Sequence, residues 1–160
     1  MRVPAGSVAP MTSTPLLTLP PGWHTHPDPA PDVLVAARGT PSCSGVPPEL
    51  VLRRAELPAA SADDLAAWRT AAVADLRRLL DRFALEDTEL LDVQGRDVLY
   101  QRFAHRGIGA ELVTEQWSWL VGRRGLTLSG TVALEDYADL CEVLEDAAAS
   151  VEPGALLTVV

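Results

Sequence analysis

Two stretches of the chain repeat apolar residues every three or four positions, the spacing that places side chains on one face of an α-helix. In residues 61–83 this apolar stripe consists of Leu65, Trp68, Ala72, Leu76, Leu79 and Phe83. In residues 134–151 it consists of Tyr137, Leu140, Cys141, Leu144, Ala148 and Val151. Ser61 followed by Asp64 predicts the capped start of the first helix. We therefore expect two amphipathic helices, each with one face against a core.

Between these helices the pattern changes to an alternation of apolar and polar residues, which is typical of β-strands. Four strands are predicted, at 88–93, 97–105, 110–121 and 126–133. Short connections that contain glycine separate them: Gly95, "RGIG" at 106–109 and "GRRG" at 122–125. Because such short connections join antiparallel neighbours, the four strands are expected to form an antiparallel meander.

The first part of the chain differs in composition from the rest. Eleven of the thirteen prolines lie in residues 1–48, where only two acidic and two basic residues occur. Proline cannot donate a ladder hydrogen bond, so this part predicts short strands at 16–20 and 32–38, followed by one at 49–57. We expect a flexible tail at 1–15, one domain at 16–152 and a second tail at 153–160.

These elements together predict an α+β fold, in which two main helices pack on an antiparallel β-sheet of about six strands. A doubly wound parallel sheet is not expected, because no crossover helix separates the consecutive strands between residues 88 and 133. A chain of 160 residues with 48% hydrophobic residues is long enough and apolar enough for one such domain.

Charge and hydropathy narrow the range of partners. The formal net charge is −9, which argues against nucleic acid or an anionic membrane surface as a partner. No apolar run reaches the roughly 18 residues of a membrane span, and prolines interrupt the N-terminal segment where a signal peptide would need an apolar stretch. The two cysteines, Cys43 and Cys141, are too few for a disulfide framework. We expect a cytoplasmic protein.

The sequence contains no recognisable catalytic motif, so neither an enzyme nor a cofactor is expected. A Gly-x-Ser-x-Gly motif and a phosphate-binding loop are absent, and the chain has no lysine. His24 and His26, two positions apart on an extended segment, project to one side and are the best candidate metal ligands. A metal site would need a third ligand, for which His105 or Glu115 is available. The alternative is that both are ordinary loop histidines.

Two other features suit recognition of a protein partner. Trp117, Trp119 and Glu115 share one face of a predicted strand. Beneath a helix the two indoles would be core residues, whereas on an open face they would be anchors for a partner. The second feature is the acidic side of the last helix, with Asp139, Glu142 and Asp146. It is either a solvated face or a docking surface for a basic partner.

The order of elements resembles the PsbP-like family of small α/β sandwiches. Four segments carry the resemblance: "LTLPPGW" at 17–23, "ELVLRRAELPAASADDL" at 49–65, the meander at 90–133, and "DYADLCEVLEDAAASV" at 136–151. The chain departs from the family at 45–48, where "GVPP" replaces an aromatic residue and an asparagine. The family includes photosystem II subunits, a Ran-binding nuclear import factor, LpqN-like lipoproteins and Eag-type chaperones of type VI secretion effectors.

The resemblance implies a non-enzymatic protein-binding adaptor or chaperone, serving a secreted client in a bacterial secretion system and acting as a monomer or a homodimer. It also implies that Trp23 packs over an edge of the sheet. The first alternative is a metal-binding protein or metal-dependent enzyme built on His24, His26 and His105. The second is a small-ligand carrier, which would need an enclosed apolar pocket.

Overall fold

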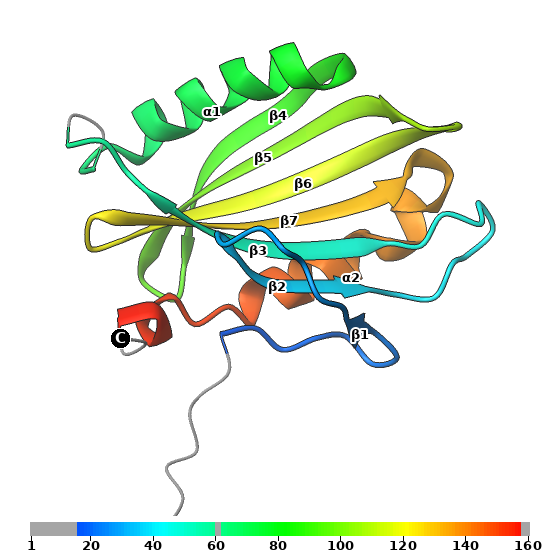
Figure 1. Cartoon of the computed structure of the whole chain (residues 1–160), viewed down its shortest axis with the longest axis horizontal. Coiled ribbons are helices and arrows are strands. Elements are labelled where there is room, and N and C mark those ends of the chain that lie inside the picture. The colour runs from blue at the N-terminus through cyan, green and yellow to red at the C-terminus, as the bar shows by residue number, and fades with distance from the viewer. Residues whose placement is uncertain (1–15, 60–61, 158–160) are drawn as a thin grey trace, which may run out of the picture.

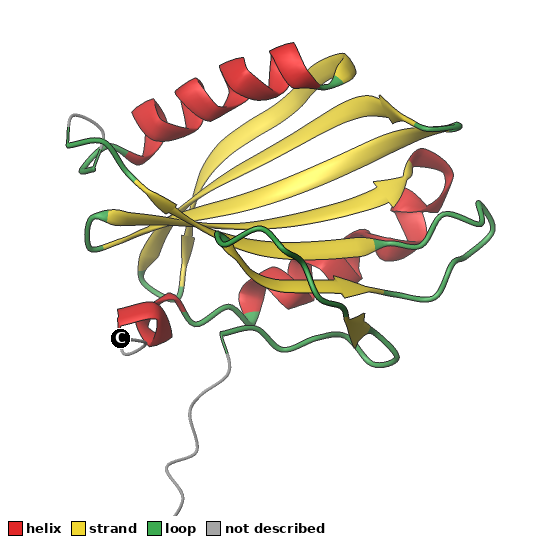
Figure 2. Cartoon of the chain, in the orientation of Figure 1, coloured by secondary structure: helices red, strands yellow, loops and turns green. Residues whose placement is uncertain are grey.

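The computed structural model describes residues 16–59 and 62–157, and within them one antiparallel seven-stranded sheet (Figures 1 and 2). The strands are β1 (His24–Thr25), β2 (Val33–Arg38), β3 (Glu49–Glu56), β4 (Asp81–Val93), β5 (Arg96–Gly107), β6 (Ala110–Val121) and β7 (Arg124–Ala133). Their order across the sheet is β1-β2-β3-β7-β6-β5-β4. The predicted α+β architecture is confirmed, with seven strands where about six were expected.

Two α-helices lie on opposite faces of this sheet (Figure 1). They are α1 (Leu65–Leu79) and α2 (Tyr137–Ala149). Each approaches β7 at a glycine: Trp68 of α1 lies against Gly125, and Leu144 of α2 lies against Gly130. Because residues an odd number of positions apart on a strand point to opposite sides, these two contacts place the helices on different faces.

Helix α1 is shorter than the sequence pattern predicts. Its N-cap is Asp64, whose carboxylate accepts a hydrogen bond from the backbone N–H of Ala67 at 2.9 Å. Ser61, the predicted cap, lies outside the described residues. The helix ends at Leu79, and Phe83 belongs to β4, where its ring lies 5.1 Å from that of Phe103. An aromatic contact within the sheet therefore replaces the last predicted turn of the helix.

The segment at 16–20 is not a strand, although it is tied to the end of α2. The backbone N–H of Thr18 donates to the Ser150 hydroxyl at 3.0 Å, and that of Glu152 donates to the Leu16 carbonyl at 3.0 Å. These contacts hold Leu17 in the core with 8% of its surface exposed. The strand predicted here is therefore wrong, while the short edge strand β1 lies further along the chain.

The turn that follows brings Trp23 against the sheet. Gly22 has a φ of 81°, and the N–H of Trp23 donates to the Pro20 carbonyl at 3.2 Å, as in a turn with proline second and glycine third. The indole then lies over Gly39, at the end of β2, where an added Cβ would be 2.7 Å from the ring. The predicted packing of Trp23 over an edge of the sheet is confirmed.

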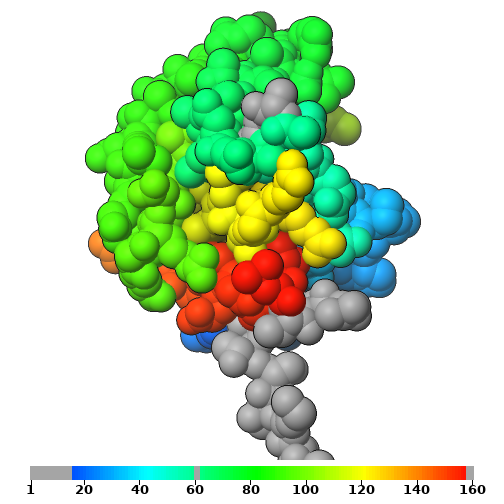
Figure 3. All heavy atoms as spheres, turned by 90° about the vertical axis from the view of Figure 1, so that its left-hand side faces the viewer, coloured from blue at the N-terminus to red at the C-terminus, as the bar shows by residue number. Residues whose placement is uncertain are grey.

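The segment predicted as a C-terminal tail, 153–160, is structured in its first part. Pro153–Leu157 form a short 3₁₀-helix, η2, and Leu156 is buried with 3% of its surface exposed. Figure 3 shows this C-terminal segment packed beside the hairpin that joins β6 to β7. The folded unit therefore extends beyond residue 152, while the predicted tail at 1–15 lies outside the described residues.

The two faces of β6 and β7 differ in polarity. The face toward α2 carries the centre of the core, formed by Val113, Trp117, Trp119, Val121, Leu126, Leu128 and Val132. Over residues 114–118 of β6 and 127–131 of β7, the face toward α1 carries hydroxyl and amide side chains, which we call the polar ladder: Thr114, Gln116, Ser118, Thr127, Ser129 and Thr131. One layer of strands thus separates a dry core from a polar surface.

The contact between Trp68 and Gly125 sets how closely α1 approaches the sheet. A Cβ at residue 125 would lie 2.3 Å from Cη2 of Trp68, so we expect Gly125→Ala to push the indole outward and cost about 1–3 kcal/mol of unfolding free energy. Denaturant unfolding measures this loss. In a Trp68→Leu background the same substitution should cost clearly less, and equal costs in both backgrounds would contradict the assigned contact.

Candidate functional site

The two tryptophans considered as binding anchors lie in the core. Trp117 and Trp119 have 4% and 2% of their surfaces exposed and are cross-strand neighbours of Leu128 and Leu126. Since α2 and the C-terminal segment cover this face, neither indole is available to a partner. The alternation of residues placed both indoles on one face without showing which face a helix covers. The alternative in which they are core residues is the one observed, and their interpretation as binding anchors is wrong.

Glu115, the third residue of that predicted surface, is also buried. Only 1% of its surface is exposed, and no hydrogen bond of normal geometry reaches either carboxylate oxygen from the described residues. Burial raises the pKa of Glu115, although the hydroxyls of Tyr137 and Tyr100 favour its ionised form. Glu115 is therefore a core carboxyl group under electrostatic strain and not a surface contact for a partner.

The acidic face of α2 remains exposed, as the sequence pattern predicts. Asp139, Glu142 and Asp146 all point to solvent, and none of them joins an ion pair with another described residue. The opposite side of the same helix buries Leu144, Ala147 and Ala148. The exposure of these three carboxylates is consistent with both interpretations, a solvated helix face and a docking surface for a basic partner.

The histidines of the proposed metal site do not converge. His24 lies on the edge strand β1, while His105 lies on β5, with β2, β3, β7 and β6 between them. Five strand spacings correspond to about 24 Å along the sheet. His105 instead bonds to the Thr114 hydroxyl at 3.0 Å, and burial lowers its pKa. In residues 16–59 and 62–157 no three potential metal ligands gather, so the site built on His24, His26 and His105 is wrong.

The best candidate for a binding site is an open groove beside α1, here called the α1 groove. It has a volume of about 280 Å³. One wall is α1, the other is β3 with the residue before β2, and the floor is formed by β6 and β7. Its lining consists of Asp32, Arg53, Arg54, Ala55, Trp68, Arg69, Ala72, Asp75, Leu76, Gln116, Thr127 and Ser129. The groove exists because α1 lies mainly over β4, β5 and β6 and reaches β7 with Trp68 at Gly125, so that the rest of this face is left partly open (Figure 1).

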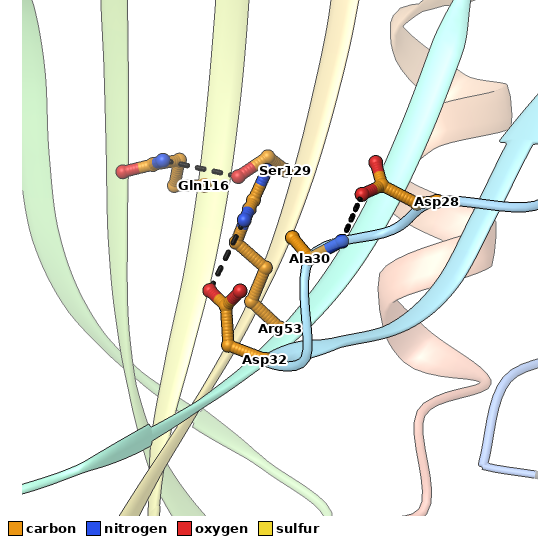
Figure 4. A network of polar contacts seen from close by, with 6 residues as sticks. All are labelled: Asp28, Ala30, Asp32, Arg53, Gln116 and Ser129. Atoms are coloured by element: carbon orange, nitrogen blue, oxygen red, sulfur yellow. Dashed lines mark hydrogen bonds and ion pairs between the residues drawn. The ribbon is translucent and has the colours of Figure 1, made fainter.

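The floor of the groove belongs to the polar ladder. Across β6 and β7, Gln116 donates to the Ser129 hydroxyl at 3.0 Å (Figure 4). The hydroxyls of Ser118 and Thr127 lie 3.1 Å apart. Paired in this way, the side chains satisfy part of their hydrogen-bonding capacity without water. Hydroxyl groups retain further donors or acceptors, so the floor can bond to a ligand that replaces solvent.

Arg69 is the charged group at the centre of this site. Only 5% of its surface is exposed, and its Nε and Nη2 donate to the side-chain oxygens of Gln101 and Gln116 at 3.2 and 2.5 Å. Burial lowers the pKa of Arg69 to about 10, so the guanidinium stays charged at neutral pH. A groove with a polar floor and one buried cation is suited to hydrogen-bonded recognition, and it differs from the enclosed apolar pocket of a ligand carrier.

Sequence reasoning missed most of this site. Arg69 lies off the apolar stripe predicted for residues 61–83, so the periodicity alone does not indicate its burial. Nothing in the sequence distinguishes it from the exposed Arg77 and Arg78 further along the same helix. The floor could have been predicted from the polar residues at every second position of β6 and β7. Such a run indicates a strand face that is not part of the apolar core.

Replacement of Glu115 by glutamine should stabilise the protein at neutral pH. A raised pKa means that the folded state holds this proton more tightly than the unfolded state, so the contribution to stability is full below the unfolded pKa and is lost as pH rises through the folded pKa. We expect Glu115→Gln to add on the order of 1–2 kcal/mol to the unfolding free energy at about pH 7, with the gain shrinking toward about pH 4.3.

Denaturant unfolding of both proteins across this pH range measures the difference. Glu142→Gln, on the exposed face of α2, is the matched control and should change stability little at any pH. A loss of stability in Glu115→Gln at about pH 7 would show instead that the ionised carboxylate is a favourable partner for its tyrosine and arginine neighbours.

Comparison with known proteins finds similarity at the level of structure. No family model and no curated protein matches the sequence. The fold matches PA94 of Pseudomonas aeruginosa, a protein of unknown function described as a candidate regulator, with a TM-score of 0.60, 14% identity and coverage of 82% of this chain and 81% of that one. It also matches LpqN of Mycobacterium tuberculosis, which is involved in cell envelope biogenesis, with a TM-score of 0.60, 16% identity and coverage of 82% and 78%.

A third match is the solution structure of the cyanobacterial PsbP protein, CyanoP, of Synechocystis sp. PCC 6803. Its TM-score is 0.57 at 16% identity, with 83% of this chain and 82% of that chain covered. At identities this low the comparison concerns architecture and carries no activity from one protein to another. With its antiparallel sheet, opposed helices and coverage of about four fifths of each chain, the protein has the fold shared by PsbP-like and LpqN-like proteins.

Proposed function

We propose that this protein is a non-enzymatic adaptor or chaperone that holds a segment of a client protein in the α1 groove. The observation that carries the proposal is the unequal covering of the sheet. One face is closed by α2 and the C-terminal segment over an apolar core, whereas the other is only partly covered by α1. A solvent-facing channel lined by two walls and a hydrogen-bonding floor is a site for an elongated ligand.

The composition of the groove supports a peptide as the ligand. Trp68, Ala72 and Leu76 give one wall an apolar surface, while the floor offers the hydroxyl of Ser129 and the amide of Gln116. A polypeptide presents both apolar side chains and backbone polar groups, so it can use both parts of this lining. The sequence had predicted exposed aromatic residues for such a site, but the described floor is polar and the aromatic contribution comes from α1.

The role that we propose extends to a secreted client of a bacterial secretion system, held in the cytoplasm before export. What supports this is the likeness of fold to an envelope-biogenesis protein and to a candidate regulator, together with an open groove in place of an assembled reactive centre. No helix among the described residues is long and apolar enough to cross a bilayer. We assign no chemical step to the protein.

A second candidate surface is the acidic face of α2. Asp139, Glu142 and Asp146 are exposed and lack basic partners among the described residues, so a basic segment could dock there. This surface lies on the other side of the sheet from the α1 groove. The two candidates can therefore be separated by a reporter placed on each face.

Site-specific photocross-linking in the source cells tests the proposal. A photoreactive amino acid is placed at Ser129 in the α1 groove, at Glu142 on the acidic face, or at Arg123 in the tip of the β6–β7 hairpin as a control. We expect one dominant cross-linked client from Ser129 and none from Arg123, with mass spectrometry identifying the cross-linked peptide.

A client captured only from Glu142 would move the function to α2 and overturn the role of the α1 groove. No cross-link from either face would contradict an adaptor or chaperone function altogether. A cross-link between two copies of this chain would identify the homodimer and name the surface that forms it.

A further inference from the structure

The α1 groove contains a buried positive charge that no acidic side chain balances. The two hydrogen bonds of Arg69 end on neutral amide oxygens, those of Gln101 and Gln116. None of the ion pairs within residues 16–59 and 62–157 includes Arg69. A charge removed from water without a counter-charge is costly, and this chain has 22 acidic residues from which a partner could have come.

The acidic residues that line the groove are already engaged. Asp32 pairs with Arg53 at 3.1 Å, and Asp75 pairs with Arg78 of its own helix. Arg54, also on the lining, joins no ion pair with a described residue. The groove is thus a local positive site in a protein whose formal net charge is −9.

The geometry of Arg69 leaves hydrogen-bonding capacity for a ligand. A guanidinium has five N–H donors, and the bonds to the two glutamines use Nε and Nη2. Nη1 makes no hydrogen bond to the part of the chain that the structure describes. The glutamine contacts also fix the plane of the guanidinium, so a ligand would meet an ordered donor group. A carboxylate is the group that such a planar donor binds best.

Resting on the proposed function, we propose that the α1 groove recognises an acidic side chain, Asp or Glu, within an otherwise apolar segment of the client, and that Arg69 is the residue that binds its carboxylate. The apolar wall of α1 then contacts the neighbouring client residues. Ser129 and Gln116 bond to polar groups of the client backbone.

A carboxylate carried by a peptide fits the groove better than a free anion. The negative charge of the whole chain repels small anions from solution, and only contacts made by the rest of a peptide compensate for this. A phosphate dianion would call for several converging cations, whereas the floor presents neutral hydroxyl and amide groups. One guanidinium, almost buried at the groove lining, matches a single negative charge.

Selection from a library of short random peptides tests the inference with the intact protein. Peptides enriched on the wild-type chain are synthesised with their acidic residue and as the matched Asn or Gln forms. We expect enrichment of an Asp or Glu flanked by apolar residues, and at least about tenfold weaker binding of the amide form by titration. Titration with acetate alone should show no comparable binding.

Three variants assign the effect to the guanidinium. Arg69→Gln should bind the acidic peptides at least about tenfold more weakly and lose the preference for the acid over the amide. Arg69→Lys, which keeps the charge without the planar fork, should fall between it and wild type. Arg123→Gln, which removes an exposed charge that is not part of the groove lining, should bind like wild type. If Arg69→Gln also disturbs the packing of α1, the comparison of acid and amide peptides on the wild-type protein still tests recognition of the carboxylate.

The outcomes separate this inference from the proposed function. Peptides that bind the groove with equal affinity as acid and amide overturn the carboxylate recognition but leave a peptide-binding groove. Acetate or inorganic phosphate could instead compete with peptide binding at concentrations near that of the peptide. This result would identify a free anion as the ligand and overturn the inference. A selection that enriches no peptide dependent on the groove overturns both.

Discussion

The alternation of side chains along β6 and β7 is the constraint on which the rest of the structure depends. Over residues 114–118 and 127–131 the α1 face of this strand pair carries hydroxyl and amide side chains, while the α2 face is apolar apart from Glu115 and Gly130, so a single layer of backbone separates two environments. The apolar face must be covered, and α2 with the C-terminal segment covers it. The polar face satisfies much of its hydrogen bonding across the strands and can therefore remain partly open.

Two glycines of β7 then decide how the helices sit on these faces. Gly125 receives the indole of Trp68 on one side, and Gly130 receives Leu144 on the other. In both places a side chain on the strand would occupy the space that the helix uses, so the absence of a Cβ allows close approach. On the polar face this approach draws α1 down far enough to bury Arg69, while the remaining strands stay uncovered. The α1 groove is thus a consequence of packing at one end of a strand.

Periodicity predicted both helices, the four-strand meander and the strands at 32–38 and 49–57, but it could not predict which surfaces would be covered. The helices and the four-strand meander follow from local patterns that the tertiary structure does not override. The predicted end of α1 was wrong: Phe83 lies in β4, where its ring contacts that of Phe103, a residue distant in sequence that the helical periodicity does not include. The burial of Trp117 and Trp119 could not be predicted, because a period of two places residues on one face of a strand without showing whether a helix covers that face. The burial of Arg69 depends on glutamines more than thirty positions away, at separations of 32 and 47 residues.

Two of the buried ionisable groups, Glu115 and Arg69, differ in a way that bears on function. Glu115 is itself a buried acid on the α2 face of β6. The next residue, Gln116, lies on the α1 face and accepts a hydrogen bond from the buried Arg69. Glu115 can relieve its strain by taking up a proton, since burial raises its pKa. Arg69 has no such relief, because its pKa of about 10 keeps it charged at neutral pH. The folded chain can therefore accommodate Glu115 by protonating it. Arg69, by contrast, gains further stabilisation only when a ligand with a negative charge binds beside it.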